Sequence, residues 1–192
     1  GNAIVSVNIT APVVNTPPVA ADDGFGAGED DAAAVRGNAL SNDSDVDGNT
    51  LSTVAQTNVA GSNGGLFSIN TTGQVTFDPN GAFEHLAAGQ TATTSFTYTV
   101  SDGQGGSDTA TVTVTVTGAN DGPTLVPGNQ PGAQTGDDGD LITPLDVSGA
   151  FTDVDGDTLG YSASGLPPGL SINPVTGVIS GTVSSNASQG GP

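Results

Sequence analysis

The chain has 192 residues, 20 of them acidic and one of them Lys or Arg, so its formal net charge at pH 7 is −19. Nucleic acids and anionic membranes are bound through basic side chains. Arg36 is the only Lys or Arg of the sequence, which argues against both partners. There is no cysteine for a disulfide, and no apolar run approaches the roughly 18 residues of a membrane-spanning helix. The sequence opens without Met or a signal peptide, so we expect it to be part of a longer protein.

The first predicted element is a strand at residues 5–10, where Val-Ser-Val-Asn-Ile-Thr alternates apolar and polar side chains. An Asn-containing linker with two prolines follows at residues 15–19. We interpret residues 1–14 as the last strand of a preceding module, with the linker opening the next one.

Two longer strands are predicted at 96–100 and 112–117, with a hairpin loop at 102–107 between them. In both strands the apolar side chains fall on alternate residues, so one face of each strand should lie against a core. Residues 15–120 would then form one complete β-sandwich module.

The sequence repeats itself at offsets close to the roughly 100 residues of such a sandwich. The strand at 112–117 and the Asn at 120 repeat the strand and Asn of the N-terminus, Asp-Val-Asp-Gly occurs at 45–48 and 153–156, and Ser-Ile-Asn occurs at 68–70 and 171–173. We therefore predict an all-β chain of tandem β-sandwiches, with a second module at 121–192. That module runs through strands at 159–162 and 178–183 and lacks its last two strands.

The loop at 42–48, Asn-Asp-Ser-Asp-Val-Asp-Gly, places carboxylates on alternate residues. Calcium takes six to eight oxygen ligands, and closely spaced Asp residues supply several from one loop. An EF-hand is excluded because its twelfth position, counted from Asp43, is Val54 rather than Glu, and strands flank the loop.

Strand direction predicts which acidic segments meet. Successive strands run up and down, so the loop after the second strand, the last hairpin loop and the incoming linker should share one end of the module. The end of the first strand and the outgoing linker should share the other end with a loop of the next module. The predicted metal ligands are Asn15, Asp43, Asp45, Asp47 and Asp102 at the first end, and Glu29, Asp30, Asn120, Asp121, Asp153, Asp155 and Asp157 at the second.

Other acidic and aromatic residues have plainer interpretations. Asp residues outside these loops are expected to make surface turns, and His85 is expected at the surface or in a corner between strands, since nothing marks a nucleophile beside it. Tyr98 is expected in the core, with its hydroxyl bonded to backbone. The Asp residues assigned to turns are Asp22, Asp23, Asp137, Asp138 and Asp140.

Several motifs together resemble a known family. Between residues 17 and 121 these are Pro-Pro-Val-Ala-Ala-Asp-Asp at 17–23, the loop at 42–48, Phe-Thr-Tyr-Thr-Val-Ser-Asp-Gly at 96–103 and Gly-Ala-Asn-Asp at 118–121. This stretch resembles the cadherin-like VCBS repeat of bacterial RTX adhesins. Residues 123–183 resemble the dystroglycan-type cadherin-like (putative Ig) module, through motifs at 151–157, 166–170 and 176–181.

The resemblance implies tandem immunoglobulin- or cadherin-like Greek-key sandwiches in a giant secreted surface protein that acts in adhesion and biofilm formation. Cadherins hold calcium between an acidic residue of the first strand, a linker Asp-Asn element and an Asp-x-Asp of the next domain; Glu29, Asn120–Asp121 and Asp153–Asp155 are similar here. Its partners would be neighbouring repeats of the same chain, with any host ligand bound elsewhere in the parent protein.

Three functions remain open from the sequence. The chain could be a calcium-rigidified extender, a module that itself binds a ligand or sugar, or an accessory domain of a secreted hydrolase. Sugar-binding faces use aromatic platforms, and a chain without Trp and with 2 Tyr favours the extender. We expect no enzymatic activity.

Overall fold

The computed structural model describes Gly1 and residues 14–186. The chain divides into two compact units, residues 1–83 with 89–118, and residues 84–88 with 119–192. The regular elements are strands apart from two single 3-10 turns, Ala39–Ser41 (η1) and Ser148–Ala150 (η2), which confirms the all-β prediction. Among the described residues no helix has the length and apolar character needed to cross a bilayer. The strand predicted at 5–10 lies outside the described residues, so its assignment to a preceding module stays a prediction.

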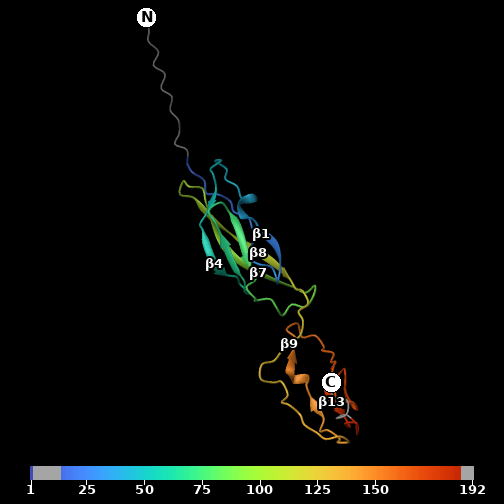
Figure 1. The fold of residues 1–192 in the computed structure, drawn as a ribbon. Coiled ribbons are helices and arrows are strands. Elements are labelled where there is room, and N and C mark those ends of the chain that lie inside the picture. Colours follow the sequence, from blue (N-terminus) through green and yellow to red (C-terminus); the bar gives the residue numbers. More distant parts are fainter. Residues whose placement is uncertain (2–13, 187–192) are drawn as a thin grey trace. The chain divides into compact units, whose positions relative to one another are not determined.

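The first unit is a sandwich of two four-stranded sheets (Figure 1). One sheet has the order β1-β8-β7-β3 and the other β2-β6-β5-β4, so neighbouring strands are often far apart in sequence, as in a Greek key. The strands of the first sheet are β1 (Asp23–Gly28), β3 (Ser52–Thr53), β7 (Thr91–Ser101) and β8 (Ser107–Thr117). Those of the second are β2 (Ala34–Asn38), β4 (Gln56–Ala60), β5 (Leu66–Ile69) and β6 (Gln74–Asp78).

The hairpin β7–β8 is the longest paired element and follows the predicted alternation. All eleven residues of each strand pair in one antiparallel register, from Thr91 with Thr117 to Ser101 with Ser107. From Thr94 to Val100 and from Ala110 to Val116 every second side chain is buried, and the outward positions of both strands are all Ser or Thr. This confirms the predicted core face, because a shift of one residue would expose every apolar side chain of a strand.

Phenylalanine rings fill the space between the two sheets. Phe67 of β5 lies 4.7 Å from Phe77 of β6 and 4.6 Å from Phe96 of β7, measured between ring centroids. Phe67 and Phe77 are completely buried. Contacts from three strands in both sheets therefore hold the sandwich closed, which is the tight packing that such a thin core requires.

Tyr98 is a core residue whose hydroxyl group lies among several oxygen acceptors. Its side chain is completely buried, and its hydroxyl lies 3.2 Å from the carbonyl oxygens of both Ala21 and Ala39. The hydroxyl also lies 3.0 Å from Asp23 Oδ2 and 3.3 Å from Asp43 Oδ2. The core position was predicted correctly, but the two carboxylate partners were not.

The second unit has shorter strands. A three-stranded sheet has the order β10-β13-β12, and β9 pairs with β11. The strands are β9 (Thr124–Leu125), β10 (Leu145–Asp146), β11 (Phe151–Thr152), β12 (Leu170–Ile172) and β13 (Val178–Gly181). The strand predicted at 159–162 is wrong: this segment pairs with no strand among the described residues, and the Tyr161 N–H donates to the Pro174 carbonyl at 2.9 Å.

Replacing Tyr98 with Phe should lower the free energy of unfolding of the first unit by about 1–3 kcal/mol, because buried acceptors lose their shared donor. Chemical denaturation followed by circular dichroism measures the change. Tyr161→Phe is the matched control, since that hydroxyl makes no hydrogen bond within the described part of the chain. Equal losses from both changes would show that the Tyr98 hydroxyl contributes nothing specific.

Candidate functional site

The loop after η1 is held in shape by Asp45, the middle one of its three alternating carboxylates. Asp45 Oδ1 accepts the backbone N–H groups of Asp47 at 2.8 Å and Asn49 at 3.2 Å. The Gly48 N–H closes a turn onto the Asp45 carbonyl, and Gly48 has φ of 74°, a conformation that favours glycine. One carboxylate therefore fixes the backbone of the loop.

The loop at 153–157 repeats this geometry in the second unit. Asp153 Oδ1 accepts the N–H groups of Asp155 at 3.1 Å and Asp157 at 3.2 Å. Gly156 has φ of 79° and donates its N–H to the Asp153 carbonyl. The sequence echo between residues 45–49 and 153–157 is thus also a structural repeat.

Each loop clamps the linker that enters its own unit. Asp47 Oδ2 accepts the Thr16 N–H at 2.6 Å, one residue after Asn15. Asp155 Oδ2 accepts the Asp121 N–H at 2.7 Å, one residue after Asn120. The same position of the Asp-x-Asp loop therefore binds the same position of both linkers.

Asp102 completes the first of these arrangements from the β7–β8 loop. Its Oδ1 accepts the N–H groups of Gln104 at 2.7 Å and Gly106 at 2.9 Å, and its Oδ2 accepts the Asn15 amide at 2.7 Å. These bonds, that from Asn15 foremost, hold the pKa of Asp102 below its ordinary value, so it is ionised at neutral pH. Asn15 Oδ1 in turn accepts the amide of Asn49 at 3.0 Å. The hairpin loop, the linker and the Asp-x-Asp loop do converge.

Asp43 lies apart from this group. Its Oδ1 accepts the Ala21 N–H at 2.8 Å, and its carboxylate faces the Tyr98 hydroxyl together with Asp23. Burial raises the pKa of both Asp23 and Asp43; the charge of Asp43 adds to the rise at Asp23, and the charge of Asp108 adds to the rise at Asp43. Asp43 therefore anchors the loop to the first strand.

Glu29 and Asn120 were also predicted at the second end, and each makes a hydrogen bond with backbone. Glu29 is buried, with 2% of its surface exposed, and its N–H donates to the Thr117 carbonyl at 3.0 Å. The Asn120 amide donates to the Asp121 carbonyl at 2.8 Å. Neighbouring Asp31 instead pairs with Arg36 at 2.9 Å.

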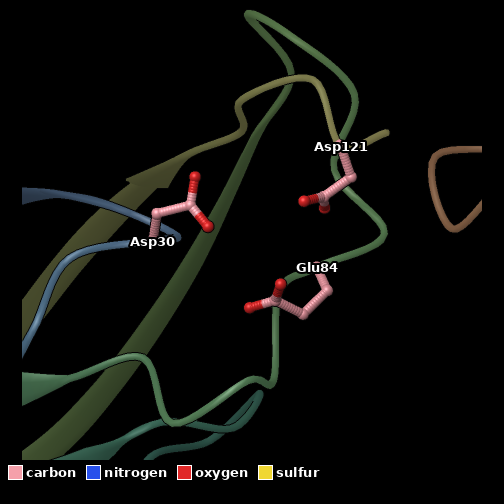
Figure 2. A group of neighbouring side chains, drawn as sticks. All are labelled: Asp30, Glu84 and Asp121. Carbon is pink, nitrogen blue, oxygen red and sulfur yellow. The ribbon is translucent and has the colours of Figure 1, made fainter. Parts of the chain in front are cut away.

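Two groups of three carboxylates in the described residues have ligand oxygens within 4.8 Å of one another. One is Asp153, Asp155 and Asp157. The other is Asp30, Glu84 and Asp121, whose side chains are labelled in Figure 2. Neither group contains Asp43, Asp45, Asp47 or Asp102.

Glu84 was missed as a candidate. It stands between the buried side chains of Phe83 and Leu86, which fix the corner and leave Glu84 half-buried. Its neighbour His85 is exposed, as predicted. The sequence signal for Glu84 was an acidic residue between two apolar residues, Phe83 and Leu86, in a segment predicted to be a corner.

The acidic residues assigned to turns divide into two sets. Asp137 and Asp140 form a turn, with the Asp140 N–H on the Asp137 carbonyl at 3.1 Å. Asp138 adjoins them and is exposed. For Asp22 and Asp23 the turn assignment is wrong: Asp22, just before β1, accepts the Thr111 N–H of β8 at 2.8 Å, and Asp23 lies in β1 and accepts the Tyr98 hydroxyl at 3.0 Å.

Two carboxylate oxygens at the clamps are covered by protein and have no hydrogen-bond partner in the described part of the chain: Asp45 Oδ2 and Asp155 Oδ1. A shielded anionic oxygen is unfavourable without a compensating donor or cation. Carboxylate, amide and carbonyl oxygens are the ligands that calcium prefers. The donor set of both loops therefore fits a hard divalent cation.

Residues 15–118 match the family model described as "Bacterial cadherin-like domain". The chain belongs to this family. Residues 122–191 match a second model, "Putative Ig domain". Cadherin-like domains are not catalytic domains, and they generally bind calcium. No curated protein matches the chain.

Solved structures show the same fold at low identity. Drosophila N-cadherin EC1-4 is 18% identical with a TM-score of 0.58, covering 87% of this chain and 41% of that chain. Mouse cadherin-23 EC22-24 is 17% identical with a TM-score of 0.53, covering 89% and 55%. An endo-fucoidan hydrolase of glycoside hydrolase family 107 is 20% identical, covering 92% of this chain and 26% of that chain, but a TM-score of 0.35 is too low to indicate a shared overall fold. The chain spans about half or less of the length of these structures.

The free energy of unfolding of the Asp43→Asn variant should increase relative to that of the unchanged protein as pH rises. A carboxyl whose pKa is raised by folding stabilises the folded state below the ordinary aspartate pKa of about 3.9 and loses this contribution as pH rises through the folded value. Denaturation in excess chelator across that interval measures the difference in free energy of unfolding.

Asp108→Asn is the matched control with the opposite sign. Asp108 accepts the Ala20 N–H at 2.9 Å, and this bond lowers its pKa, so its contribution is present above the ordinary aspartate pKa and is lost as pH falls. The penalty of Asp108→Asn should therefore fade toward low pH. Parallel pH profiles for the two variants would contradict the assignment.

Proposed function

We propose that this chain is a calcium-rigidified extender of a large secreted bacterial adhesin of the RTX type, built from a VCBS-like repeat and the beginning of a second, dystroglycan-type repeat. Its repeats would hold a ligand-binding region, located elsewhere in the parent protein, away from the cell surface in adhesion and biofilm formation. Membership of the bacterial cadherin-like family and the repeated clamp geometry support this proposal.

The observation that carries the proposal is the pair of shielded oxygens, Asp45 Oδ2 and Asp155 Oδ1. The two residues hold different positions in their loops, since Asp45 corresponds to Asp153 and Asp155 corresponds to Asp47. In both loops the other carboxylate oxygens accept N–H groups of the linker or of the loop itself. Backbone donors have thus been used where they are within reach, and a cation is the remaining partner that satisfies both oxygens at neutral pH.

Calcium would be held by side-chain oxygens of each unit. In the first, the donors are Asn15, Asp45, Asp47 and Asp102. In the second, they are Glu84, Asp121, Asp153, Asp155 and Asp157. The second set has more carboxylates, and it has no counterpart of the hairpin-loop Asp102 among the described residues.

Calcium would act on the linkers by removing repulsion. Two unit charges about 4 Å apart repel by about 4 kcal/mol at an effective dielectric of 20, and a divalent cation reverses the sign of that interaction. The linker at 119–122 ends in glycine and follows Gly118, so its backbone has little intrinsic stiffness. Fixing Asp121 to the loop at 153–157 would restrict bending between neighbouring repeats, which are the partners we propose.

A ligand-binding role for these repeats has less support. A sugar platform needs exposed aromatic rings, whereas Tyr98 and the phenylalanines of the first unit are buried or half-buried. The outward face of β7 and β8 consists of Ser and Thr. An inert spacer fits such a surface.

Saturating calcium should raise the melting temperature of the chain. A site that binds only the folded state adds about 2.7 kcal/mol at one hundred times its dissociation constant, and extracellular calcium modules bind at about 10⁻⁴ to 10⁻³ M. Scanning calorimetry in excess chelator and in several millimolar calcium measures this. The double change of Asp45 and Asp47 to Asn should weaken calcium binding at the first unit, because each change removes a ligand charge.

The matched control is the double change of Asp137 and Asp138 to Asn, which removes the same charge from a turn outside the clamps. It should leave the calcium response intact. A melting temperature that ignores calcium, or equal losses of response from both double variants, would refute the proposed sites.

Calcium should also narrow the distribution of chain dimensions in small-angle scattering, since bending at residues 119–122 would be restricted. Asp121→Ala should remove this difference while both units stay folded by circular dichroism, and Asp137→Ala should preserve it. Identical scattering of the unchanged protein with calcium and with chelator would leave calcium, if bound, as a local stabiliser and would exclude a rigidifying role.

A further inference from the structure

Two Asn-Gly pairs lie in turns of the first unit, Asn63–Gly64 and Asn80–Gly81. In an Asn-Gly pair the backbone nitrogen of the glycine can approach the side-chain amide of the asparagine, because glycine has no side chain to block it and the most freedom to rotate. Both asparagines are exposed to solvent. The two pairs therefore share sequence and solvent access, and they differ in how the fold holds them.

The fold fixes the reactive groups of the first pair. The Asn63 side-chain amide donates to the Thr93 carbonyl at 2.7 Å, and the Gly64 N–H donates to the Gly61 carbonyl at 3.2 Å. A Cβ added at Gly64 would lie 2.6 Å from the Cβ of Ala82, so this glycine has little room to move. The amide that would be attacked and the nitrogen that would attack it are both held by hydrogen bonds.

The same two groups are unbonded at the second pair. The Ala82 N–H closes the turn onto the Pro79 carbonyl at 3.0 Å, and Asp78 Oδ1 accepts the Asn80 N–H at 2.9 Å. The Asn80 side-chain amide and the Gly81 N–H make no hydrogen bond within the described part of the chain. A Cβ added at Gly81 would meet no atom within 4 Å, so the surrounding space is open.

We propose that Asn80–Gly81 is a site of spontaneous deamidation through a cyclic imide. The Gly81 backbone nitrogen loses its proton to base and attacks the side-chain carbonyl carbon of Asn80, forming a C–N bond. The bond from that carbon to the amide nitrogen breaks, and the departing group takes up a proton and leaves as ammonia. Water opens the succinimide at either carbonyl and yields aspartate or the β-linked isoaspartate, which adds one negative charge to a chain of net charge −19. The inference is independent of calcium.

The β-linked product should disturb the packing beside the turn. It lengthens the backbone by one methylene group between Pro79 and Ala82. Pro79 and Phe83 are buried, and Ala82 lies close against Gly64. Because protein interiors are close-packed, the backbone cannot lengthen here without displacing a buried side chain. Isoaspartate at position 80 should therefore destabilise the first unit, whereas aspartate keeps the ordinary backbone.

Incubation of the full chain at mildly alkaline pH, followed by proteolysis and mass spectrometry, tests the assignment. Asn80 should be converted roughly tenfold to a hundredfold faster than Asn63, because the two hydrogen bonds that hold Asn63 and Gly64 must first open. The rate at Asn80 should rise with hydroxide concentration, since the attacking nitrogen must be deprotonated. In denaturant, where the fold holds neither pair, the two asparagines should react at similar rates.

The matched variant is Asn80→Gly, which suits the φ of 50° at this position and has no amide to lose. It should form no product at position 80 and should leave the rate at Asn63 unchanged. Equal conversion of the two asparagines in the folded protein, faster conversion of Asn63, or an Asn80 that stays intact while the denatured chain reacts would overturn the proposal.

The melting temperature of incubated protein tests the structural consequence. It should fall in proportion to the isoaspartate measured with isoaspartyl methyltransferase, which methylates the β-linked product. Freshly prepared Asn80→Asp carries the same added charge on an ordinary backbone and should melt close to the unchanged protein, and incubated Asn80→Gly should not lose stability. Incubated protein that is rich in isoaspartate and melts like fresh protein would overturn the predicted disturbance of the packing.

Discussion

Backbone N–H groups, rather than basic side chains, neutralise most of the carboxylates of this protein. The described residues contain a single salt bridge between side chains, Arg36 with Asp31. The carboxylates that accept backbone N–H groups include Asp22, Asp43, Asp45, Asp47, Asp102, Asp108, Asp140, Asp146, Asp153 and Asp155. Because such bonds need a particular loop or linker conformation, each acidic residue also fixes a piece of backbone. The −19 charge is therefore part of how the fold is specified, in addition to keeping the surface soluble.

When backbone N–H groups neutralise a carboxylate, part of its acceptor capacity stays unused. A carboxylate offers about four acceptor positions on two oxygens, whereas one or two N–H groups usually reach it. At Asp155, the Asp121 N–H occupies Oδ2 and leaves Oδ1 covered but unpaired. The geometry that ties a linker to a loop thus produces a concentration of negative potential at the same place. A cation site and a linker clamp are then two consequences of one arrangement, which explains why the Asp-x-Asp-Gly loop and the linker Asn recur together in the sequence.

Local patterns predicted what depends on local geometry. The alternation in β7 and β8 gave the core face, since side chains in a strand alternate with a period of two residues. The repeated loops gave the positions of two clamps, because an Asx-type turn is determined within five residues. Two assignments depend on partners far away in sequence and could not be read in this way. Asp43 lies in the predicted loop but bonds to Ala21, and Glu84 gains its significance from Asp121, 37 positions later. The strand predicted at 159–162 failed for the same reason, because a strand exists only with a neighbour to pair with.

The two units differ in how much of their structure the core can support. Beyond residue 118, the buried apolar side chains of the described chain are Ala150 and Val183, whereas the first unit buries a cluster of phenylalanines and valines. Apolar burial contributes about 25 cal/mol for each Å² removed from water, so the second unit gains much less from its core. Its short strands of two to four residues are consistent with this. Such a unit is sensitive to whatever else binds it, since any species that binds only the folded form shifts the folding equilibrium. Two separate places in this unit can bind such a species: the polar loop at 153–157, and an open apolar groove of about 420 Å³ whose lining includes Leu125 and Phe151. The second unit is therefore the part of the chain whose order depends most on its surroundings.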